Sequence, residues 1–372
     1  MTRYSRWLAH SFGILLLAGF IGGALARRPR LTRGIDNSVQ NFLYRTRGSK
    51  PGDARIVLAA IDDESISRIG AFPWRRSVSA KLIDRLTRLG ARTIAFDMMF
   101  VDPSAYPLDD KALADATQTS GRVILGEFVS SGEDGKTEER QAPLPLIARG
   151  AAGMGNTSVV AGLEPDGTIR SYRTSISSAG NPDAYPLALA AVAHFLHEDP
   201  RQLAASLPPR IRLNYRGSWE AGSFRMIPVS HILDDQLSPT ETGALREALV
   251  LVGSVSQKAF DIFPSPFGGQ IPGPLVVLTL ADNILDHRWL VTLPPAVDFL
   301  LCTTPVALIL VWCAALSSAA YLAGAAGVAL ACFLASWLSF SAGLWLRPAG
   351  LLTAFLAALI WTIAARKSLT RG

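Results

Sequence analysis

Two short apolar runs, each ending in aspartate, organise the first third of the chain. Residues 56–61 are continuously apolar and stop at Asp62 and Asp63. Residues 93–96 form a second run, which stops at Asp97. Continuous apolar runs of this length, without alternation, are typical of strands that are buried on both faces. The pattern therefore predicts two buried strands whose carboxyl ends carry carboxylates.

An amphipathic segment, residues 77–89, separates these two runs. Its apolar side chains recur at helical spacing, charged side chains fall between them, and Gly90 follows where a left-handed cap would stand. A strand, a crossover helix and a strand of these lengths predict a right-handed parallel unit. Both aspartate-bearing ends would then lie at one edge of the same sheet.

The alternation of strands and helices continues along the chain. We expect helices at residues 109–120, 186–197 and 274–285, and strands at residues 122–129, 211–214 and 248–252. We also expect a polar surface loop over residues 130–140 and a hairpin over residues 158–176, with Asp166 and Gly167 in its turn. This order predicts an α/β fold with a doubly wound, mostly parallel sheet.

The strand-end aspartates are the best candidates for chemistry. In open α/β sheets ligands bind outside the carboxyl ends of strands, and carboxylates on adjacent strand ends come within about 5 to 6 Å of one another. We therefore predict that Asp62, Asp63 and Asp97 bind a ligand, with a cation as the group that such a pair favours. The alternative is that these aspartates cap helices or accept hydrogen bonds from loop amides.

Two further residues, Trp74 and Arg75, are predicted to contact a ligand. A Trp over a groove with an Arg beside it would hold an anion, or the Trp would anchor a partner. The alternative is a Trp packed on the core and a solvated Arg. His194 and His197 lie three residues apart, but the sequence places no third metal ligand. It assigns no metal and no cofactor, and it predicts no catalytic residue, since neither a nucleophile elbow nor a P-loop is present.

The composition changes the picture from a soluble protein to a membrane protein. Of the 372 residues 49% are hydrophobic and only 18% are charged, and residues 290–365 contain one acid, Asp298, and one base, Arg347. Spans of about 20 apolar residues cross a bilayer. We expect four of them, at residues 7–26, 297–316, 319–338 and 349–365. All three cysteines fall in these spans, which excludes a disulfide framework in the soluble part.

The first apolar stretch, residues 7–26, is predicted to be an uncleaved anchor, with a cleaved export signal as the alternative. Either one sends the following domain across the membrane. The basic tail after residue 365 favours a cytoplasmic carboxyl terminus, whereas the arginines at positions 27, 28, 30 and 33 oppose this orientation by the positive-inside rule. The net charge of +6 is scattered, so nucleic acid is not expected as a partner.

Several ordered motifs give the region from about residue 36 to 290 a family resemblance. They are AIDDES at 60–65, IGAFPWRR at 69–76, LGA at 89–91, AFD at 95–97, DG at 166–167 with Arg170, NYRG at 214–217, VLVGS at 250–254 with Asp261, and PFG at 266–268 before PG at 272–273. Together they resemble the second type of CHASE domain, an extracellular sensor module of bacterial histidine kinases, nucleotide cyclases and serine/threonine kinases. The family usually has a polar Glu and His after the last motif, where this chain has the apolar residues 274–278.

The resemblance implies a membrane-anchored sensor in the inner membrane, with its soluble domain in the periplasm or outside the cell. We expect an anchor at residues 1–35, a sensor domain at 36–292, a helix bundle at 293–365 and a cytoplasmic tail at 366–372. A tail of this length holds no kinase or cyclase, so the predicted partner is an effector in trans, and a homo-oligomer through the middle span is a second expectation. The alternatives are an extracytoplasmic enzyme, a structural membrane protein that binds a partner, and a truncated relic.

Overall fold

The computed structural model describes most of the chain between residues 29 and 347. The described ranges are residues 29–131, 137–158, 162–176, 183–256, 261–294, 297–298 and 318–347. The chain divides into two compact units. One is Gly48–Trp289, and the other combines Met1–Arg47 with Leu290–Gly372.

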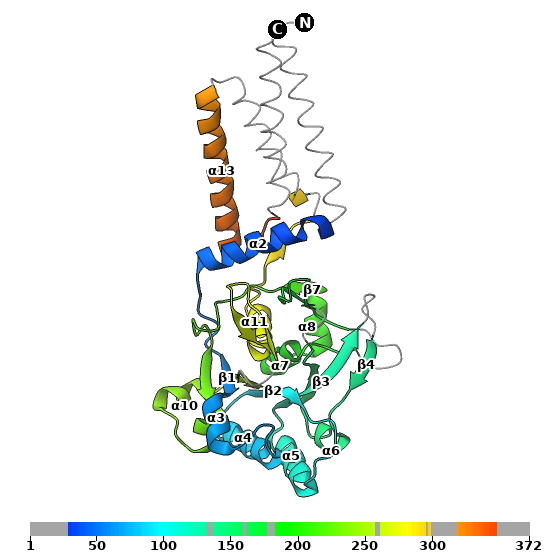
Figure 1. Cartoon of the computed structure of the whole chain (residues 1–372). Helices are drawn as coiled ribbons and strands as arrows, with labels where there is room; N and C mark the ends of the chain where they lie inside the picture. The colour runs from blue at the N-terminus through cyan, green and yellow to red at the C-terminus, as the bar shows by residue number, and fades with distance from the viewer. Residues whose placement is uncertain are drawn as a thin grey trace. The chain divides into compact units, whose positions relative to one another are not determined.

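The Gly48–Trp289 unit is built on a seven-stranded sheet (Figure 1). Its strand order is β4-β3-β2-β9-β1-β8, and β5 also pairs with β3. The strands are β1 (Ile56–Ile61), β2 (Thr93–Met99), β3 (Val123–Ser131), β4 (Thr137–Gln141), β5 (Gly153–Asn156), β8 (Arg225–Pro228) and β9 (Leu249–Ser254). The β3–β4 pairing is antiparallel and the others are parallel. The expected α/β class with a mostly parallel sheet is confirmed.

Helices cover both faces of this sheet, as Figure 1 shows. One face packs on α3 (Asp63–Ile69), α4 (Arg76–Arg88), α5 (Pro107–Ser120) and α9 (Val229–Leu233), and the other on α7 (Leu187–Leu196) and α11 (Gly273–Leu285). Alternate residues of each central strand point to opposite faces. The core on the α4 side accordingly takes Val57, Ala59 and Ile61 from β1, and Ile94 and Phe96 from β2.

Smaller elements complete the unit. They are the helices α6 (Pro145–Ala148), α8 (Pro200–Ser206) and α10 (Pro239–Leu245), the antiparallel pair β6 (Ser171–Arg173) and β7 (Arg210–Arg212), and the hairpin of β10 (Ile262–Pro264) and β11 (Gln270–Pro272). The predicted Asp166–Gly167 turn is present: Gly167 has φ +75° and Leu163 bridges Ile169 in antiparallel fashion. Glycine accepts this left-handed conformation without steric cost.

The prediction that β1 and β2 are adjacent strands is wrong. The two strands are parallel members of one sheet, but β9 lies between them and pairs with both, so that Leu251 stands beside Leu58 and Ala95. The apolar run of β9 lies far along the chain, and every backbone hydrogen bond it makes with the sheet is long-range. Sequence proximity alone therefore favoured the direct pairing of β1 with β2. Asp62 and Asp97 are consequently not on adjacent strands.

The predicted loop at residues 130–140 is also wrong in its second half. Residues 137–141 form β4, which pairs antiparallel with the end of β3. Arg140 donates from Nε to Glu127 Oε2 at 2.9 Å, and Glu127 is buried. Tertiary pairing of this kind overrides the polar, aperiodic character of the segment. The predicted helices over residues 77–89, 109–120, 186–197 and 274–285 are confirmed as α4, α5, α7 and α11.

The second unit contains α2 (Pro29–Arg47), α13 (Ser318–Ser341) and the short parallel pair of β12 (Val291–Thr292) and β13 (Leu344–Trp345). Tyr44 of α2 packs edge-on against Phe340 of α13, with ring centroids 4.8 Å apart. The arginines at positions 30 and 33 lie in α2.

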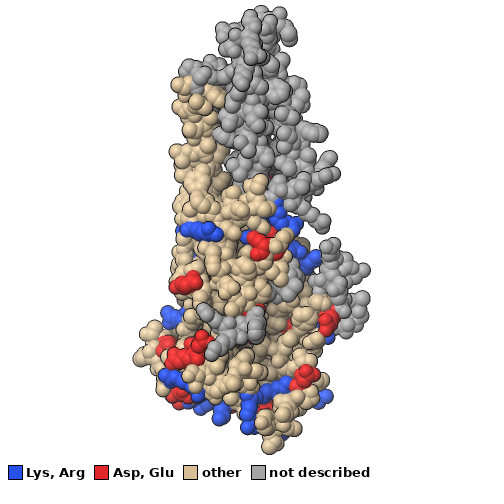
Figure 2. Space-filling view, viewed as in Figure 1, with Lys and Arg blue, Asp and Glu red and all other residues tan. Residues whose placement is uncertain are grey.

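Within the described residues one helix is long and apolar enough to cross a membrane, Ala319–Ser341 with 23 residues. It covers the predicted span 319–338, and Figure 2 shows no charged side chain on its visible surface. The predicted spans at 7–26 and 349–365 lie outside the described residues, as does the span at 297–316 apart from residues 297 and 298. Four membrane-spanning helices therefore stay a prediction.

Candidate functional site

The carboxyl end of β1 uses its aspartates for local structure. Asp62 is the N-cap of α3, and its Oδ1 accepts a hydrogen bond from the Ser65 amide at 2.8 Å. Asp63 Oδ1 accepts a hydrogen bond from the Ser256 hydroxyl at 2.5 Å. Capping of this kind satisfies an amide that the first helical turn leaves unpaired. These partners account for both aspartates without a ligand.

The segment between α3 and α4 places Trp74 and Arg75 differently. Trp74 donates from Nε1 to the Gly70 carbonyl at 2.8 Å and packs edge-on against Phe72, with ring centroids 5.5 Å apart. Arg75 donates from Nε to Asp109 Oδ2 at 2.7 Å and lies over the Tyr106 ring at 3.9 Å. The Arg75 charge is therefore paired, while Trp74 is held by its neighbours as part of a half-buried aromatic pair.

The carboxyl end of β2 is irregular. Its register against β3 shifts between Ala95 and Met99, which is the sign of a β-bulge. Bulges re-aim side chains and are frequent beside functional sites. On the α4 side of the strand, Phe96 and Met98 line a cavity, whereas Asp97 lies on the side of α11. One stretch of three residues thus serves two different environments.

Two glycines make room for carboxylates on the α11 side. A Cβ added to Gly253 of β9 would stand 3.5 Å from the Cβ of Asp97 and 2.6 Å from Cγ of Pro274. A Cβ added to Gly273, the first residue of α11, would stand 1.9 Å from Oδ2 of Asp261. Asp97 and Asp261 therefore flank the first turn of α11, close enough for their charges to interact.

Asp97 lacks the local partners that Asp62 has. Among the described residues no donor lies within hydrogen-bonding distance of its carboxyl group. Burial, and to a smaller extent the negative charge of Asp261, raise the pKa of Asp97 to about 8. The pKa of Asp261 is raised by partial burial of its carboxyl group. Burial also raises the pKa of Tyr172 on this side, and the charge of Asp97 contributes to that shift. Asp97 is therefore largely protonated at neutral pH.

A cavity of about 320 Å³ lies on the opposite side of β2. Its walls come from the carboxyl ends of β1, β9 and β2, from the first turn of α4, and from the segment before α4. We call it the β2–α4 cavity. Its lining includes Phe72, Trp74, Ser79, Phe96, Met98 and Met99. This is the edge of a parallel α/β sheet at which ligands bind in other proteins.

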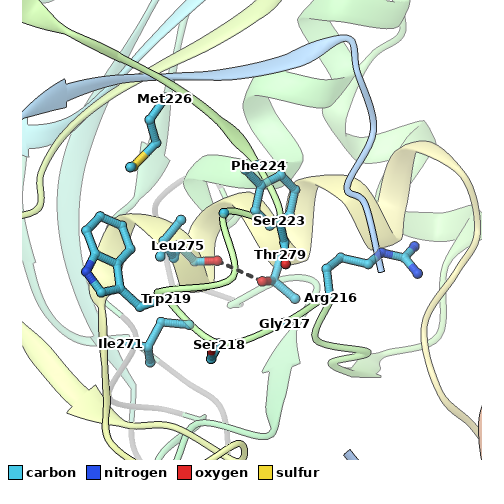
Figure 3. Close-up of a pocket in the computed structure, with 11 residues that line it drawn as sticks. Arg216, Gly217, Ser218, Trp219, Ser223, Phe224, Met226, Ile271, Leu275 and Thr279 are labelled. Atoms are coloured by element: carbon cyan, nitrogen blue, oxygen red, sulfur yellow. Dashed lines mark hydrogen bonds between the residues drawn. The ribbon is translucent and has the colours of Figure 1, made fainter. Parts of the chain in front are cut away.

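A second hollow, shown in Figure 3, is much smaller. It lies against α11, with Trp219, Met226 and Leu275 around it, and Thr279 donates a hydrogen bond to the Leu275 carbonyl there at 2.7 Å. Its volume of about 20 Å³ has room for about one water molecule. A ligand larger than a water molecule is therefore accommodated far better by the β2–α4 cavity.

The comparison with protein families decides which proteins this chain resembles as a whole. The family model described as the CHASE2 domain matches residues 14–320. The chain belongs to the CHASE2 family. Comparison with curated proteins and comparison with solved structures found no match. CHASE2 domains are sensory extracellular domains of membrane proteins.

The CHASE2 motifs of this chain have structural partners in the fold. Arg170, which is 1% exposed, donates from Nη1 to Asp166 Oδ1 at 2.8 Å. Arg216 donates from Nε to the buried Asp282 of α11 at 2.7 Å. Burying a charge is costly unless it is paired, so these pairs fix their loops on the domain. The apolar residues 274–278, which follow the last of these motifs, form the buried first turns of α11.

Two groups of residues at the site were not predicted from the sequence. Asp261 stood among the family motifs but was not connected with Asp97, because nothing in the sequence brings Asp261 and the start of α11 close to Asp97. Ser79 and Met98 were not predicted to line a cavity, because the hydrophobic pattern indicates only that they lie in a helix and in a strand. The continuation of the apolar run through Met98 and Met99 beyond Asp97 was the available signal.

Proposed function

We propose that this protein is a membrane-anchored sensor whose CHASE2 domain lies outside the cytoplasm and binds a ligand at the carboxyl edge of its sheet. The observation that carries the proposal is the CHASE2 match over residues 14–320. The apolar helix Ala319–Ser341 supports membrane attachment.

The proposed location is the inner membrane, with several spans and the soluble domain on the outer side. Four spans, as the hydrophobic pattern predicts, would put both termini in the cytoplasm. The signal would pass through the helices of the second unit, in which α13 is free of charged residues. A separate kinase or cyclase as the effector, and a homo-oligomer formed through the membrane helices, belong to the same proposal.

We place the ligand at the end of β2 rather than at the end of β1. Asp62, Asp63 and Arg75 each have a protein partner within 3 Å that accounts for their position. Trp74, by contrast, lines the β2–α4 cavity, and on the other face of the same strand end Asp97 has no such partner among the described residues. The protein is proposed to bind its ligand without converting it, as a sensory domain does.

The orientation in the membrane tests the sensor function directly. In a background in which the three native cysteines are replaced by alanine, Lys111→Cys and Gly372→Cys each provide one thiol; Lys111 is exposed on α5. We expect a membrane-impermeant maleimide to label Lys111→Cys in right-side-out vesicles and Gly372→Cys only in inverted ones. Labelling of Lys111→Cys only in inverted vesicles would place the domain in the cytoplasm and overturn the proposal.

A further inference from the structure

We propose that the β2–α4 cavity binds a small neutral molecule with an apolar body of about two rings and a single hydrogen-bonding group. The inference names the ligand class of the proposed sensor site and rests in that respect on the proposed function. The cavity itself, its lining and its charge are properties of the Gly48–Trp289 unit alone.

The volume sets the size of the ligand. Protein interiors are packed as densely as organic crystals, and voids larger than a water molecule are few. An engineered apolar cavity of about 150 Å³ stays dry and binds benzene. The β2–α4 cavity, at about 320 Å³, has roughly twice that volume and fits a molecule of about two fused or linked rings.

The lining sets the polarity of the ligand. Aromatic rings of Phe72, Trp74 and Phe96 and the thioethers of Met98 and Met99 dominate the walls. Methionine side chains are flexible and polarizable, and they adapt to ligands of different shape. Met99 is 42% exposed at the rim, a large apolar side chain that a bound ligand would partly cover. These groups favour an apolar, preferably aromatic, ligand body.

Arg76, the one cation among the described residues that line the cavity, is already paired with a carboxylate. Arg76 donates from Nη1 to Asp110 Oδ1 at 2.8 Å, and its Nη2 donates to the Asp102 carbonyl. Asp110 is buried, so this pair is part of the domain and not a mobile surface contact. An anionic ligand would have to compete with Asp110 for Arg76 or leave its charge unpaired in an apolar site, which is costly. A neutral ligand avoids both.

One polar group in the lining is available to a ligand. Ser79 lies on α4, and among the described residues its hydroxyl has no hydrogen-bond partner. The neighbouring Ser77 hydroxyl, by contrast, donates to Asp109 at 3.2 Å. Polar groups in the walls of apolar cavities fix ligand orientation. A hydroxyl, carbonyl or ether on the ligand would complete the hydrogen bonding of Ser79.

A matched set of three probes tests the proposal. The probes are 2-naphthol, naphthalene and 2-naphthoate, which share a two-ring body and differ only in the polar group. Binding of each is measured by equilibrium dialysis on the full chain in lipid nanodiscs, with empty nanodiscs as the blank for partition into lipid. We expect saturable binding of one 2-naphthol per chain, about two- to tenfold weaker binding of naphthalene, and more than tenfold weaker binding of 2-naphthoate.

Two substitutions of Ser79 and one control substitution assign this binding to the cavity. Ser79→Phe places a ring inside the cavity and is expected to abolish 2-naphthol binding, whereas Lys81→Phe adds the same ring on the exposed face of α4 and should leave binding unchanged. Ser79→Ala removes only the hydroxyl, so 2-naphthol and naphthalene should then bind equally. Ser79→Ala keeps the test decisive if the larger substitution unfolds the domain.

Three results would overturn the proposal. They are tighter binding of 2-naphthoate than of 2-naphthol, full 2-naphthol binding to a folded Ser79→Phe variant, and the absence of saturable binding of any probe to the wild-type chain. Each would remove this ligand class and leave the sensor function standing, because that function is tested separately by the membrane orientation of Lys111→Cys.

Discussion

The ends of β1 and β2 lie at the same edge of one sheet and both carry aspartate, yet they are built for different purposes. At the end of β1 the carboxylate of Asp62 caps α3, and the carboxylate of Asp63 accepts a hydrogen bond from Ser256. At the end of β2, after a register shift, Asp97 has no described partner on the α11 side of the strand, and a cavity lies beside Met98 on the other side. The end of β1 therefore uses its carboxylates to hold the fold together, whereas the end of β2 has an unpaired carboxyl group on one face of the sheet and a cavity on the other.

The largest effect that we expect is a pH dependence of the stability of the folded domain, caused by Asp97 at the end of β2. Its pKa is raised from 3.8 to about 8, so the folded state retains a proton that the unfolded state has released. Stability contributed by Asp97 is therefore complete below about pH 4 and is lost as the pH rises through about 8. The slope is at most about 1.4 kcal/mol per pH unit.

Asp97→Asn should remove this slope from the free energy of unfolding, measured by urea titration of the full chain between pH 5 and pH 9. Asp261→Asn serves as the control, because burial and not Asp261 is the main cause of the Asp97 shift. Asp261→Asn should keep the slope that Asp97 contributes and move the upper end of that slope to lower pH, because it removes a charge that raises the pKa of Asp97. It also removes the separate contribution of the raised pKa of Asp261. Identical pH profiles for wild type and Asp97→Asn would show that Asp97 is ordinarily solvated and ionised.

A second prediction concerns how tightly the α11 side of this region is packed. Gly253→Ala would place a Cβ 2.6 Å from Cγ of Pro274, a rigid ring at the start of α11. The strand or the helix must shift, and we expect a loss of about 1 to 3 kcal/mol in the free energy of unfolding.

Gly243→Ala in α10 is the matched control, since nothing lies within 4 Å of its added Cβ. It should stabilise the helix by up to about 1 kcal/mol. Equal effects of the two substitutions on the urea midpoint would contradict the close packing of α11 against the end of β9.

The smallest expected effect is at the end of β1. Asp62→Ala removes the N-cap of α3 and should cost about 1 kcal/mol of stability, while Asp62→Asn, also a good cap, should cost almost nothing. Neither should change the binding of 2-naphthol by as much as twofold. A loss of binding in Asp62→Asn would mean that the two strand ends share one site.

The sequence predicted the parts of this fold that depend on local pattern. The apolar run of β1 matches its strand from Ile56 to Ile61, and α4 was placed to within one residue. The position of β9 between β1 and β2 could not be predicted, because pairing partners in a parallel sheet are chosen by long-range packing. The same limit separated Asp97 from Asp261, which only the fold brings together. Trp74 lines the β2–α4 cavity, and the cation in that lining is Arg76 and not Arg75, so the ligand contacts expected of Trp74 and Arg75 stay predictions.

Hydrogen–deuterium exchange on the full chain in nanodiscs, with and without saturating 2-naphthol, tests most directly whether the end of β2 is the ligand site of this CHASE2 domain. We predict slower amide exchange over residues 72–79 and 96–100, which border the cavity, and unchanged exchange over residues 62–69 at the end of β1. Protection confined to residues 216–224 around the hollow of Figure 3, with none over residues 96–100, would contradict the assignment.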